Sequence, residues 1–523
     1  MRLLRSALLV TAISFSCAGA SHAQAGPVAT GSEARTARAF EAARKQGPLA
    51  LRSFLIGMPK GADLHVHLSG AVYAENFIRA AGEDGLCIDP KGLNFVKPGG
   101  VGCGANPGTV SASDLLAHIE QPYNQGLYDK LIDAFSMRSY VPTTGWSGHD
   151  QFFATFAHFG GTDKRHTGEW VDEVVSRAAN QNEQYVELME TPPFSHAATI
   201  AYQIGWDSNL AEFRQKLLDA GLDQEVDAAK EHIQSALALR DKLERCTLPE
   251  HYAPGCKVQV RFLYQVLRGF PKQQVFAQTL LGFETISKMP EFVGINFVMP
   301  EDGYLSMADY TEHMRMIEYL HSIYPKVHIT LHAGELAPGL VPPDGLRFHI
   351  WQAVDMAHAE RIGHGVDVLY EDDPAKLLKH LAEKHIMIEI NLTSNEGILG
   401  ISGANHPLPY YRKAGVPVAL STDDEGVSRI DLTHEYVKAA LDFNLTYADL
   451  KQMARTGMEH NFLPGQSLWA EEDKFTVPAA ACHTQQLGSQ NPSPNCKAFL
   501  ESSEKATAQW EQEKRFREFE TKW

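Results

Sequence analysis

Eight short apolar segments that alternate with helix-like segments constrain the fold of this chain more than any other feature. Several of them are apolar almost throughout, as expected of strands buried on both faces of a parallel sheet. We expect strands at residues 62–67, 185–190, 257–265, 293–298, 327–332, 361–364, 386–391 and 416–422. Amphipathic helices are predicted between them, as at residues 344–359 and 374–385. Alternating strands and helices indicate a parallel α/β fold, and eight units indicate a closed (β/α)8 TIM barrel.

The other parts of the 523-residue chain extend this barrel, which we place at residues 59–465. Residues 26–58 are rich in Ala, Arg and Glu and predict an N-terminal helical arm. The sequence between the first two strands is too long for a loop. We therefore expect a helical insertion at about residues 70–180. Residues 466–523 form a C-terminal extension, which we expect to contain a loop and one charged helix at 497–523.

Residues 1–25 have the pattern of a secretory signal peptide. Two arginines precede an apolar run at residues 7–18, and small residues precede a cleavage site near Ala23 or Ala25. The apolar run is too short to span a bilayer, which takes about 20 residues. We therefore expect the mature protein to be secreted or periplasmic.

Six cysteines remain after cleavage, and they fall into three local pairs. Each pair closes a short segment rich in Gly, Pro or Asn. The pairs are Cys87 with Cys103, Cys246 with Cys256, and Cys482 with Cys496. Six cysteines allow fifteen connectivities, and an oxidising compartment favours the sequential one, with free surface thiols as the alternative. None has Cys-x-x-Cys spacing, which argues against a cysteine zinc site.

The acidic composition excludes some classes of partner. The formal net charge is −17. Nucleic acids and anionic membrane surfaces need a basic footprint, so we expect neither as a partner. The sequence is compatible with an oligomer.

Polar side chains gather where four of the predicted strands end. They are His65 and His67 after the first strand, His332 and Glu335 after the fifth, His364 after the sixth, and Asp423 and Asp424 after the eighth. In a barrel of this kind the carboxyl ends of the strands carry the active site. These imidazoles and carboxylates are therefore expected at one rim.

Four of these side chains suit a metal ion. His65 and His67 are two residues apart in a strand, so both can face the barrel axis and bind one ion. With His332 and Asp423 they offer imidazole nitrogens and a carboxylate oxygen, which suit zinc and similar divalent ions. This set leaves room for a water, whose pKa a metal lowers toward about 7.

Two further side chains suit proton transfer. Glu335 follows His332 closely enough to move protons at the same site, and His364 can take or orient the proton of the water. Each motif alone has a structural explanation, such as a helix N-cap for the paired aspartates. Their occurrence together at four strand ends favours a metal site.

The motifs "DLHVHLSGA", "HAGE", "RIGHG" and "AGVPVALSTDDE", and also "LTSN" at 392–395, resemble the successive signatures of the adenosine deaminase family, within the metal-dependent amidohydrolase superfamily. The resemblance covers roughly residues 58–465. It implies one zinc ion per chain, bound by His65, His67, His332 and Asp423.

The resemblance also implies the reaction and the role of three side chains. Glu335 would protonate the purine ring at N1, His364 would orient or deprotonate the attacking water, and Asp424 would contact N7. The substrate would be a small-molecule purine nucleoside. Adenosine or 2′-deoxyadenosine would become inosine or 2′-deoxyinosine, with release of ammonia.

The chain differs from the family pattern at positions that concern the substrate. Ser69 stands where members that act on adenosine commonly have an Asp that contacts ribose. Met299 stands where a Gly approaches purine N3, and Glu425 replaces a Pro. The stretch "HDQFFATF" at 149–156 resembles the helix that lines the purine pocket, with plain helix packing as the alternative.

Three alternatives stay open. The same chemistry could act on adenine or on an N6-substituted purine. Another amidohydrolase reaction is possible, although two-metal members usually place a lysine at the end of strand four, where this chain has Asn296 and Met299. A secreted, non-catalytic binding or signalling protein on the same scaffold would be expected to lack Glu335 or a metal ligand, and this chain keeps them all.

Overall fold

The computed structural model describes residues 31–99, 102–103, 108–162, 164–248 and 250–523. The signal peptide expected at 1–25 lies outside these residues. Within the described ranges, no helix combines the length and the apolar character needed to cross a membrane.

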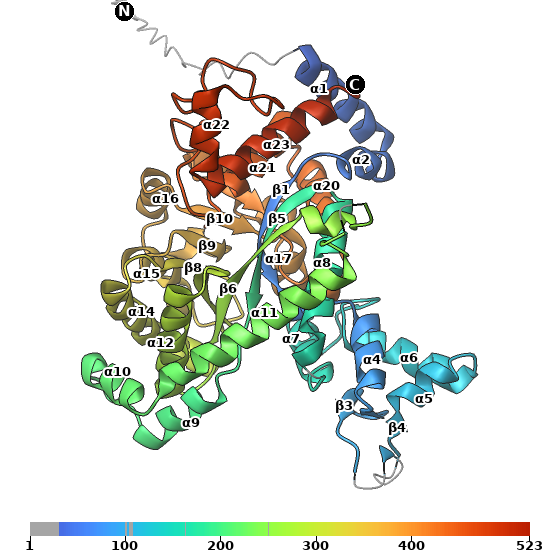
Figure 1. Ribbon diagram of the computed structural model, residues 1–523. Helices are drawn as coiled ribbons and strands as arrows, with labels where there is room; N and C mark the ends of the chain where they lie inside the picture. Colours follow the sequence, from blue (N-terminus) through green and yellow to red (C-terminus); the bar gives the residue numbers. More distant parts are fainter. Residues whose placement is uncertain (1–30, 100–101, 104–107, 163, 249) are drawn as a thin grey trace, which may run out of the picture.

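Eight parallel strands form the barrel at the centre of Figure 1. In order around the sheet they are β1 (Gly61–His67), β5 (Glu183–Glu190), β6 (Gln259–Leu267), β7 (Phe292–Val298), β8 (His328–Ala333), β9 (Arg361–His364), β10 (Met387–Ile390) and β11 (Val418–Leu420). A parallel bridge between Val66 and Asp423 joins the first strand to the end of the last. The eight strands and the TIM barrel expected from the sequence are confirmed, with strand ends within two residues of prediction.

Helices follow the strands and cover the outside of the barrel. They are α9 (Ser195–Ile204), α10 (Leu210–Asp219), α11 (Glu225–Leu243), α12 (Lys272–Lys288), α13 (Tyr304–Ala308), α14 (Tyr310–Ile323), α15 (His349–Asp355), α16 (Pro374–Glu383), α17 (Leu392–Leu399), α18 (Leu408–Ala414), α19 (Glu425–Ser428), α20 (Leu432–Asp442) and α21 (Tyr447–Glu459). The helix expected at 374–385 is α16.

The single helix expected at 344–359 is wrong. A short 3-10 turn at Pro343–Leu346 precedes α15, which begins only at His349. The buried carboxylate of Glu371 accepts the amide of Ile350 at 2.6 Å, so a distant side chain caps α15 and fixes where it starts.

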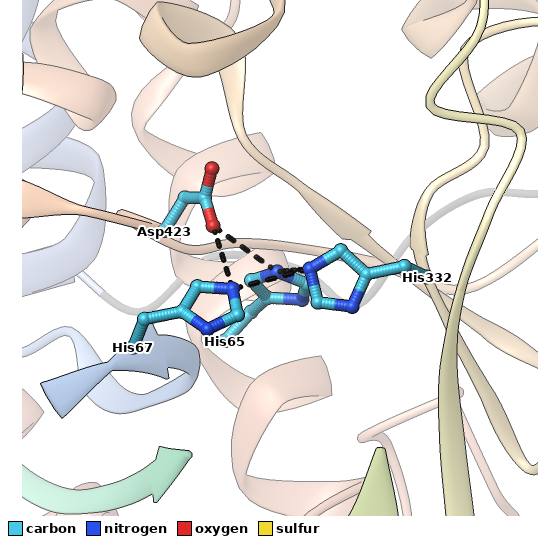
Figure 2. Close-up of side chains that lie close together, drawn as sticks. All are labelled: His65, His67, His332 and Asp423. Atoms are coloured by element: carbon cyan, nitrogen blue, oxygen red, sulfur yellow. Dashed lines mark hydrogen bonds and ion pairs between the residues drawn. The ribbon is translucent and has the colours of Figure 1, made fainter. Parts of the chain in front are cut away.

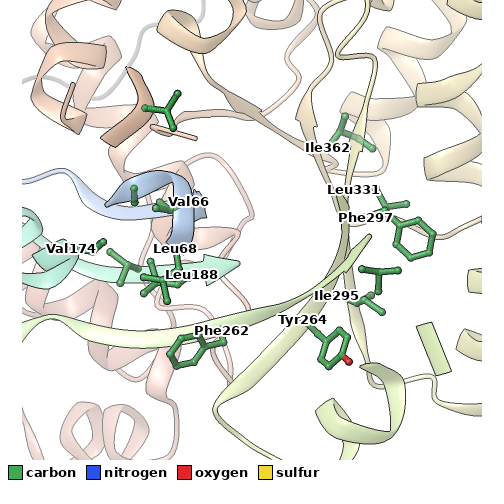
Figure 3. Packing of buried hydrophobic residues seen from close by; sticks show 14 of the residues in the cluster. Val66, Leu68, Val174, Leu188, Phe262, Tyr264, Ile295, Phe297, Leu331 and Ile362 are labelled. Carbon is green, nitrogen blue, oxygen red and sulfur yellow. The ribbon is translucent and has the colours of Figure 1, made fainter. Parts of the chain in front are cut away.

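The main core lies between the strands and the surrounding helices. Figure 3 shows Val66, Leu188, Phe262, Leu331 and Ile362 on five strands of the barrel, and all five are buried. Burial of each such side chain contributes about 1.5–3 kcal/mol to folding. This packing holds the strands in register and so fixes where their polar ends lie.

The segment between β1 and β5 is the insertion, and it holds more than helices. Its helices are α3 (Leu68–Ala71), α4 (Ala74–Glu83), α5 (Ala112–Ala117), α6 (Pro122–Ala134), α7 (Gly148–His158) and α8 (Thr167–Asn180). It also contains an antiparallel sheet of β2 (Cys87–Asp89), β3 (Asn94–Val96) and β4 (Val110–Ser111) in the order β3-β2-β4. Helices α4 to α6 and this sheet project from the barrel at the lower right of Figure 1.

The cysteines pair sequentially. The structure has disulfides between Cys87 and Cys103, Cys246 and Cys256, and Cys482 and Cys496. A bridge that closes a loop of such length stabilises by about 3 kcal/mol in the chain-entropy model.

Both ends of the described chain lie on the side of the barrel where the strands begin. The N-terminal arm consists of α1 (Gly31–Gln46) and α2 (Pro48–Leu55), which lie near the C-terminal helices at the top of Figure 1. The one helix expected at 497–523 is wrong. Two helices form, α22 (Pro494–Glu501) and α23 (Glu504–Glu520), because the side chain of Ser503 caps α23 by accepting the amide of Ala506 at 3.0 Å.

We expect Phe516→Ala to destabilise the whole protein, because Phe516 of α23 is only 1% exposed and belongs to the main core. Truncating a buried Phe costs about 3–5 kcal/mol. Thermal unfolding followed by circular dichroism should show a lower Tm. Glu518→Ala, at an exposed position of the same helix, is the control. Equal Tm values for the two variants would mean that α23 is not part of the cooperative fold.

Candidate active site

A cavity of about 380 Å³ opens at the carboxyl ends of the strands. Its lining combines polar and charged side chains with apolar ones. Its lining consists of His67, Ser69, Phe152, Phe153, Phe156, Gln265, Leu267, Val298, Met299, Pro300, His332, Glu335, Asp423 and Asp424. Three phenylalanines of α7, from the stretch noted at 149–156, therefore line the cavity.

Three imidazoles and a carboxylate converge at the polar end of the cavity (Figure 2). His65 and His67 come from the end of β1, His332 from β8 and Asp423 from the residues after β11. Their ligand atoms lie within 4.8 Å of one another. The Nε2 atoms of His65 and His67 are each 3.1 Å from Nε2 of His332, and they lie 3.4 and 3.2 Å from Oδ1 of Asp423.

The outer nitrogen of each ring has an oxygen partner. Nδ1 of His65 donates to Glu389 at 2.6 Å, and Nδ1 of His67 donates to Gln265 at 2.8 Å. Nδ1 of His332 donates to Asn296 at 2.8 Å. A neutral imidazole with its proton on Nδ1 presents a lone pair at Nε2. Three lone pairs then face one another beside a carboxylate, an arrangement that a divalent cation satisfies. The residues therefore fit a metal ion.

Asp423 is held in place by two of these rings and by a serine. Burial acts to raise the pKa of this carboxyl, but the adjacent imidazoles of His65 and His67 hold it well below its usual value. Its other oxygen accepts the hydroxyl of Ser394 at 2.6 Å. Ser394 belongs to the "LTSN" motif, for which the sequence indicated no role. The hydrogen bond to Asp423 supplies one.

Glu335 and His364 form a second group around Asp423. Nε2 of His364 lies 3.7 Å from Oε1 of Glu335. Burial, and then the charge of Asp423, raise the pKa of Glu335 well above its usual value, which favours its protonated form. Burial lowers the pKa of His364 to about 3, and Asn395 donates to its Nδ1 at 2.9 Å, which leaves the proton of the neutral ring on Nε2.

Asp424, Ser69 and Met299 line the same cavity. Oδ1 of Asp424 is buried and has no hydrogen-bond partner among the described residues, and burial raises the pKa of this carboxyl well above its usual value. Met299 has φ +87°, in the left-handed region that bulky residues rarely adopt. Glu425, by contrast, is not in the lining: it forms a buried ion pair with Arg177 at 2.6 Å.

Glu301 is a functional residue that sequence reasoning missed. Its carboxylate is 1% exposed and accepts the amides of Gly334 at 3.0 Å and Glu335 at 2.9 Å. His349 donates to it through Nδ1, and the guanidinium of Arg268 lies 3.8 Å away. Glu301 therefore anchors the loop that carries Glu335. The only signal was an acidic residue in "MPED", just after the fourth barrel strand.

Comparison with known proteins agrees on one family. A family model described as adenosine deaminase matches residues 168–470. Adenosine deaminases from two strains of Yersinia pseudotuberculosis are 39% identical to the chain over 149 residues, or 28% of this chain. The aligned part of the chain spans only 41% of the length of these curated relatives.

A solved structure supports the fold. An adenine deaminase from Arthrobacter aurescens superimposes with a TM-score of 0.50 at 16% identity, and the match covers 78% of this chain and 94% of the other. At this identity the likeness concerns the barrel architecture alone.

We expect His67→Ala to lower the amount of divalent metal that the protein retains, because it removes one of the converging Nε2 atoms. Metal content after dialysis, measured by elemental analysis, checks this. His328→Ala is the matched control, since His328 lies at the opposite end of the same strand as His332. Unchanged metal content in His67→Ala would remove His67 from the ligand set.

Proposed function

The chain belongs to the adenosine deaminase family of hydrolytic deaminases, and on that basis we propose that it deaminates a 6-aminopurine nucleoside, with adenosine and 2′-deoxyadenosine as the expected substrates. Water adds at C6, the bond from C6 to the amino nitrogen breaks, and ammonia leaves, so that adenosine becomes inosine. The observation that carries this proposal is the position of the buried Glu335 carboxyl beside the group of His65, His67, His332 and Asp423.

We propose zinc as the metal, one ion per chain, held by the three Nε2 atoms and Oδ1 of Asp423. Three nitrogens and one oxygen are a common donor set of catalytic zinc. When bound, such an ion lowers the pKa of a coordinated water toward about 7 and thereby supplies a nucleophile at neutral pH.

The other side chains of the site would then handle protons. In its protonated form, Glu335 can deliver its proton to the ring nitrogen next to C6 as the attacking oxygen adds. His364, whose Nε2 lies 3.7 Å from Oε1 of Glu335, can orient the attacking water or receive its proton. Asp424, with its free buried Oδ1, can face N7 of the purine.

We also propose that the protein acts outside the cytosol, as a secreted or periplasmic enzyme. The three local disulfides support this location, because such bonds persist in oxidising compartments. Fractionation of the native host, followed by mass spectrometry of the N-terminus, tests the location and the cleavage site together.

A substrate panel tests the proposed function. Zinc-loaded protein is mixed with adenosine, 2′-deoxyadenosine, adenine or N6-methyladenosine, and absorbance follows the loss of the 6-aminopurine. We expect turnover of at least one of the two nucleosides with a free 6-amino group. Turnover of only adenine or N6-methyladenosine would move the activity to another substrate, and no turnover of any would favour a non-catalytic role.

We expect Glu335→Gln to retain the metal and to lose at least about 100-fold in kcat, because an amide cannot replace a carboxyl as proton donor. Steady-state kinetics and metal analysis of the same preparation check both parts. Substantial remaining activity in a metal-loaded variant would mean that another group delivers the proton.

We expect Glu301→Gln to lower kcat by about tenfold with little change in KM, because the new amide group would face backbone N–H groups of Gly334 or Glu335 and displace their loop. Metal content should stay close to that of the unmodified protein, whereas Tm should fall, because Arg268 and His349 lose a buried charged partner. An unchanged kcat would show that Glu301 does not position Glu335.

A further inference from the structure

The lining of the cavity divides into polar side chains, which can hold the reacting part of a purine, and an apolar half. The apolar half consists of Phe152, Phe153, Phe156, Leu267, Val298, Met299 and Pro300. A purine bound with C6 at the polar end would direct its N9 substituent toward this half. The apolar character of this half therefore affects which N9 substituent the site accepts.

Within the apolar half, Met299 has the most unusual backbone conformation. It follows β7 directly and takes φ +87° although it carries a long side chain. Its thioether lies against Gly269, where an added Cβ would come within 2.7 Å of the Met299 methyl carbon. The guanidinium of Arg268 donates to the Met299 carbonyl at 3.3 Å. A strained backbone that is fixed by neighbours and borders a cavity is a mark of a functional position.

Few side chains in the lining are free to bind hydroxyl groups. Gln265 uses its carbonyl oxygen to accept from His67 and its amide nitrogen to donate to Thr191 at 2.9 Å. Glu335 and Asp424 are engaged by the purine in the proposed reaction. Of the described side chains around the cavity, Ser69 is the one left with an uncommitted hydroxyl. A substituent with several buried hydroxyls would lose hydrogen bonds to water without replacing them.

The charge of the lining disfavours a phosphate group in the cavity. Of the residues that the structure places around the cavity, none is Lys or Arg, whereas Glu335, Asp423 and Asp424 are acidic. A phosphate needs a cation or a set of convergent N–H donors to offset its charge. A nucleotide would bring like charges together in a partly desolvated space.

We propose that the cavity selects 6-aminopurines whose N9 substituent is uncharged and poor in hydroxyl groups, and that Met299 sets this selectivity. The inference rests on the proposed deaminase function and adds a substrate class to it. The thioether of Met299 contacts the substituent and replaces the polar surroundings that a hydroxylated sugar would need.

Relative kcat/KM values of the zinc-loaded full chain test the proposal. The probes are adenosine, 5′-deoxyadenosine, 2′-deoxyadenosine and AMP. We expect at least one deoxy analogue to exceed adenosine by about tenfold, the size of effect that one hydroxyl has in an apolar pocket. AMP should not be turned over detectably.

Two variants assign the selectivity to Met299. Met299→Gly removes the thioether at a backbone conformation that glycine adopts without strain, so the variant should fold. It should lower the ratio of deoxy analogue to adenosine at least about fivefold. Met299→Leu keeps an apolar side chain of similar volume and should leave that ratio within about twofold.

The possible failures are distinguishable. If neither deoxy analogue exceeds adenosine, or if AMP is a good substrate, the selectivity proposal is wrong and the deaminase function stands. If the preference exists but Met299→Gly leaves it unchanged, the assignment to Met299 is wrong. If no 6-aminopurine is turned over, the proposed function fails and the selectivity fails with it.

Discussion

The carboxylate of Glu389 is the interaction on which the interior of this barrel depends. It lies on β10 with no exposure to solvent, and it accepts hydrogen bonds from His65 of β1 at 2.6 Å, Thr330 of β8 at 2.8 Å and Arg361 of β9 at 2.7 Å. Arg361 continues to Glu187 of β5 at 2.6 Å. One buried network thus links five strands across the barrel.

This network is costly to break. Arg361 and His65 keep the pKa of Glu389 below its usual value, although burial acts to raise it. Removing one partner from a buried, hydrogen-bonded charge leaves the others uncompensated, at a cost of about 3–5 kcal/mol. The same carboxylate fixes the orientation of the His65 ring, so the stability of the barrel interior and the geometry of the ligand set are coupled through a single side chain.

The sequence predicted the four candidate metal ligands but not the residues that hold them in place by hydrogen bonds. His65, His67, His332 and Asp423 follow apolar segments that are easy to recognise, and the barrel rule then places them at one rim. Their supporting partners are ordinary polar residues, and in several cases the contact spans a long stretch of chain: His65 and Glu389 are 324 residues apart. A residue whose hydrogen-bond partner lies on a distant strand cannot be recognised from the sequence around it, because the folded barrel determines which strands face each other.

The errors in the predicted secondary structure also arise from contacts that the local sequence does not show. The helices expected at 344–359 and 497–523 continue as amphipathic patterns across positions where the chain turns. Glu371 caps α15 from another segment, and Ser503 caps α23 from within a run of helix-forming residues. The short strands of the insertion, two or three residues each, carry too few residues for an alternation to be visible.

Three residues at the carboxyl ends of the barrel strands have a strained backbone. Met299, His364 and Asp423 follow or close three different strands with positive φ, a conformation that costs about 1–3 kcal/mol for a residue with a side chain. Gly363 precedes His364, and a Cβ there would come within 2.5 Å of the His65 ring. The opposite end of the barrel is covered by α23, where the Ala508 carbonyl accepts the side-chain amide of Gln184 at 2.6 Å. Ser69 and Met299, the two positions that differ from the family pattern, line the cavity at the carboxyl ends of the strands, so they lie away from this contact.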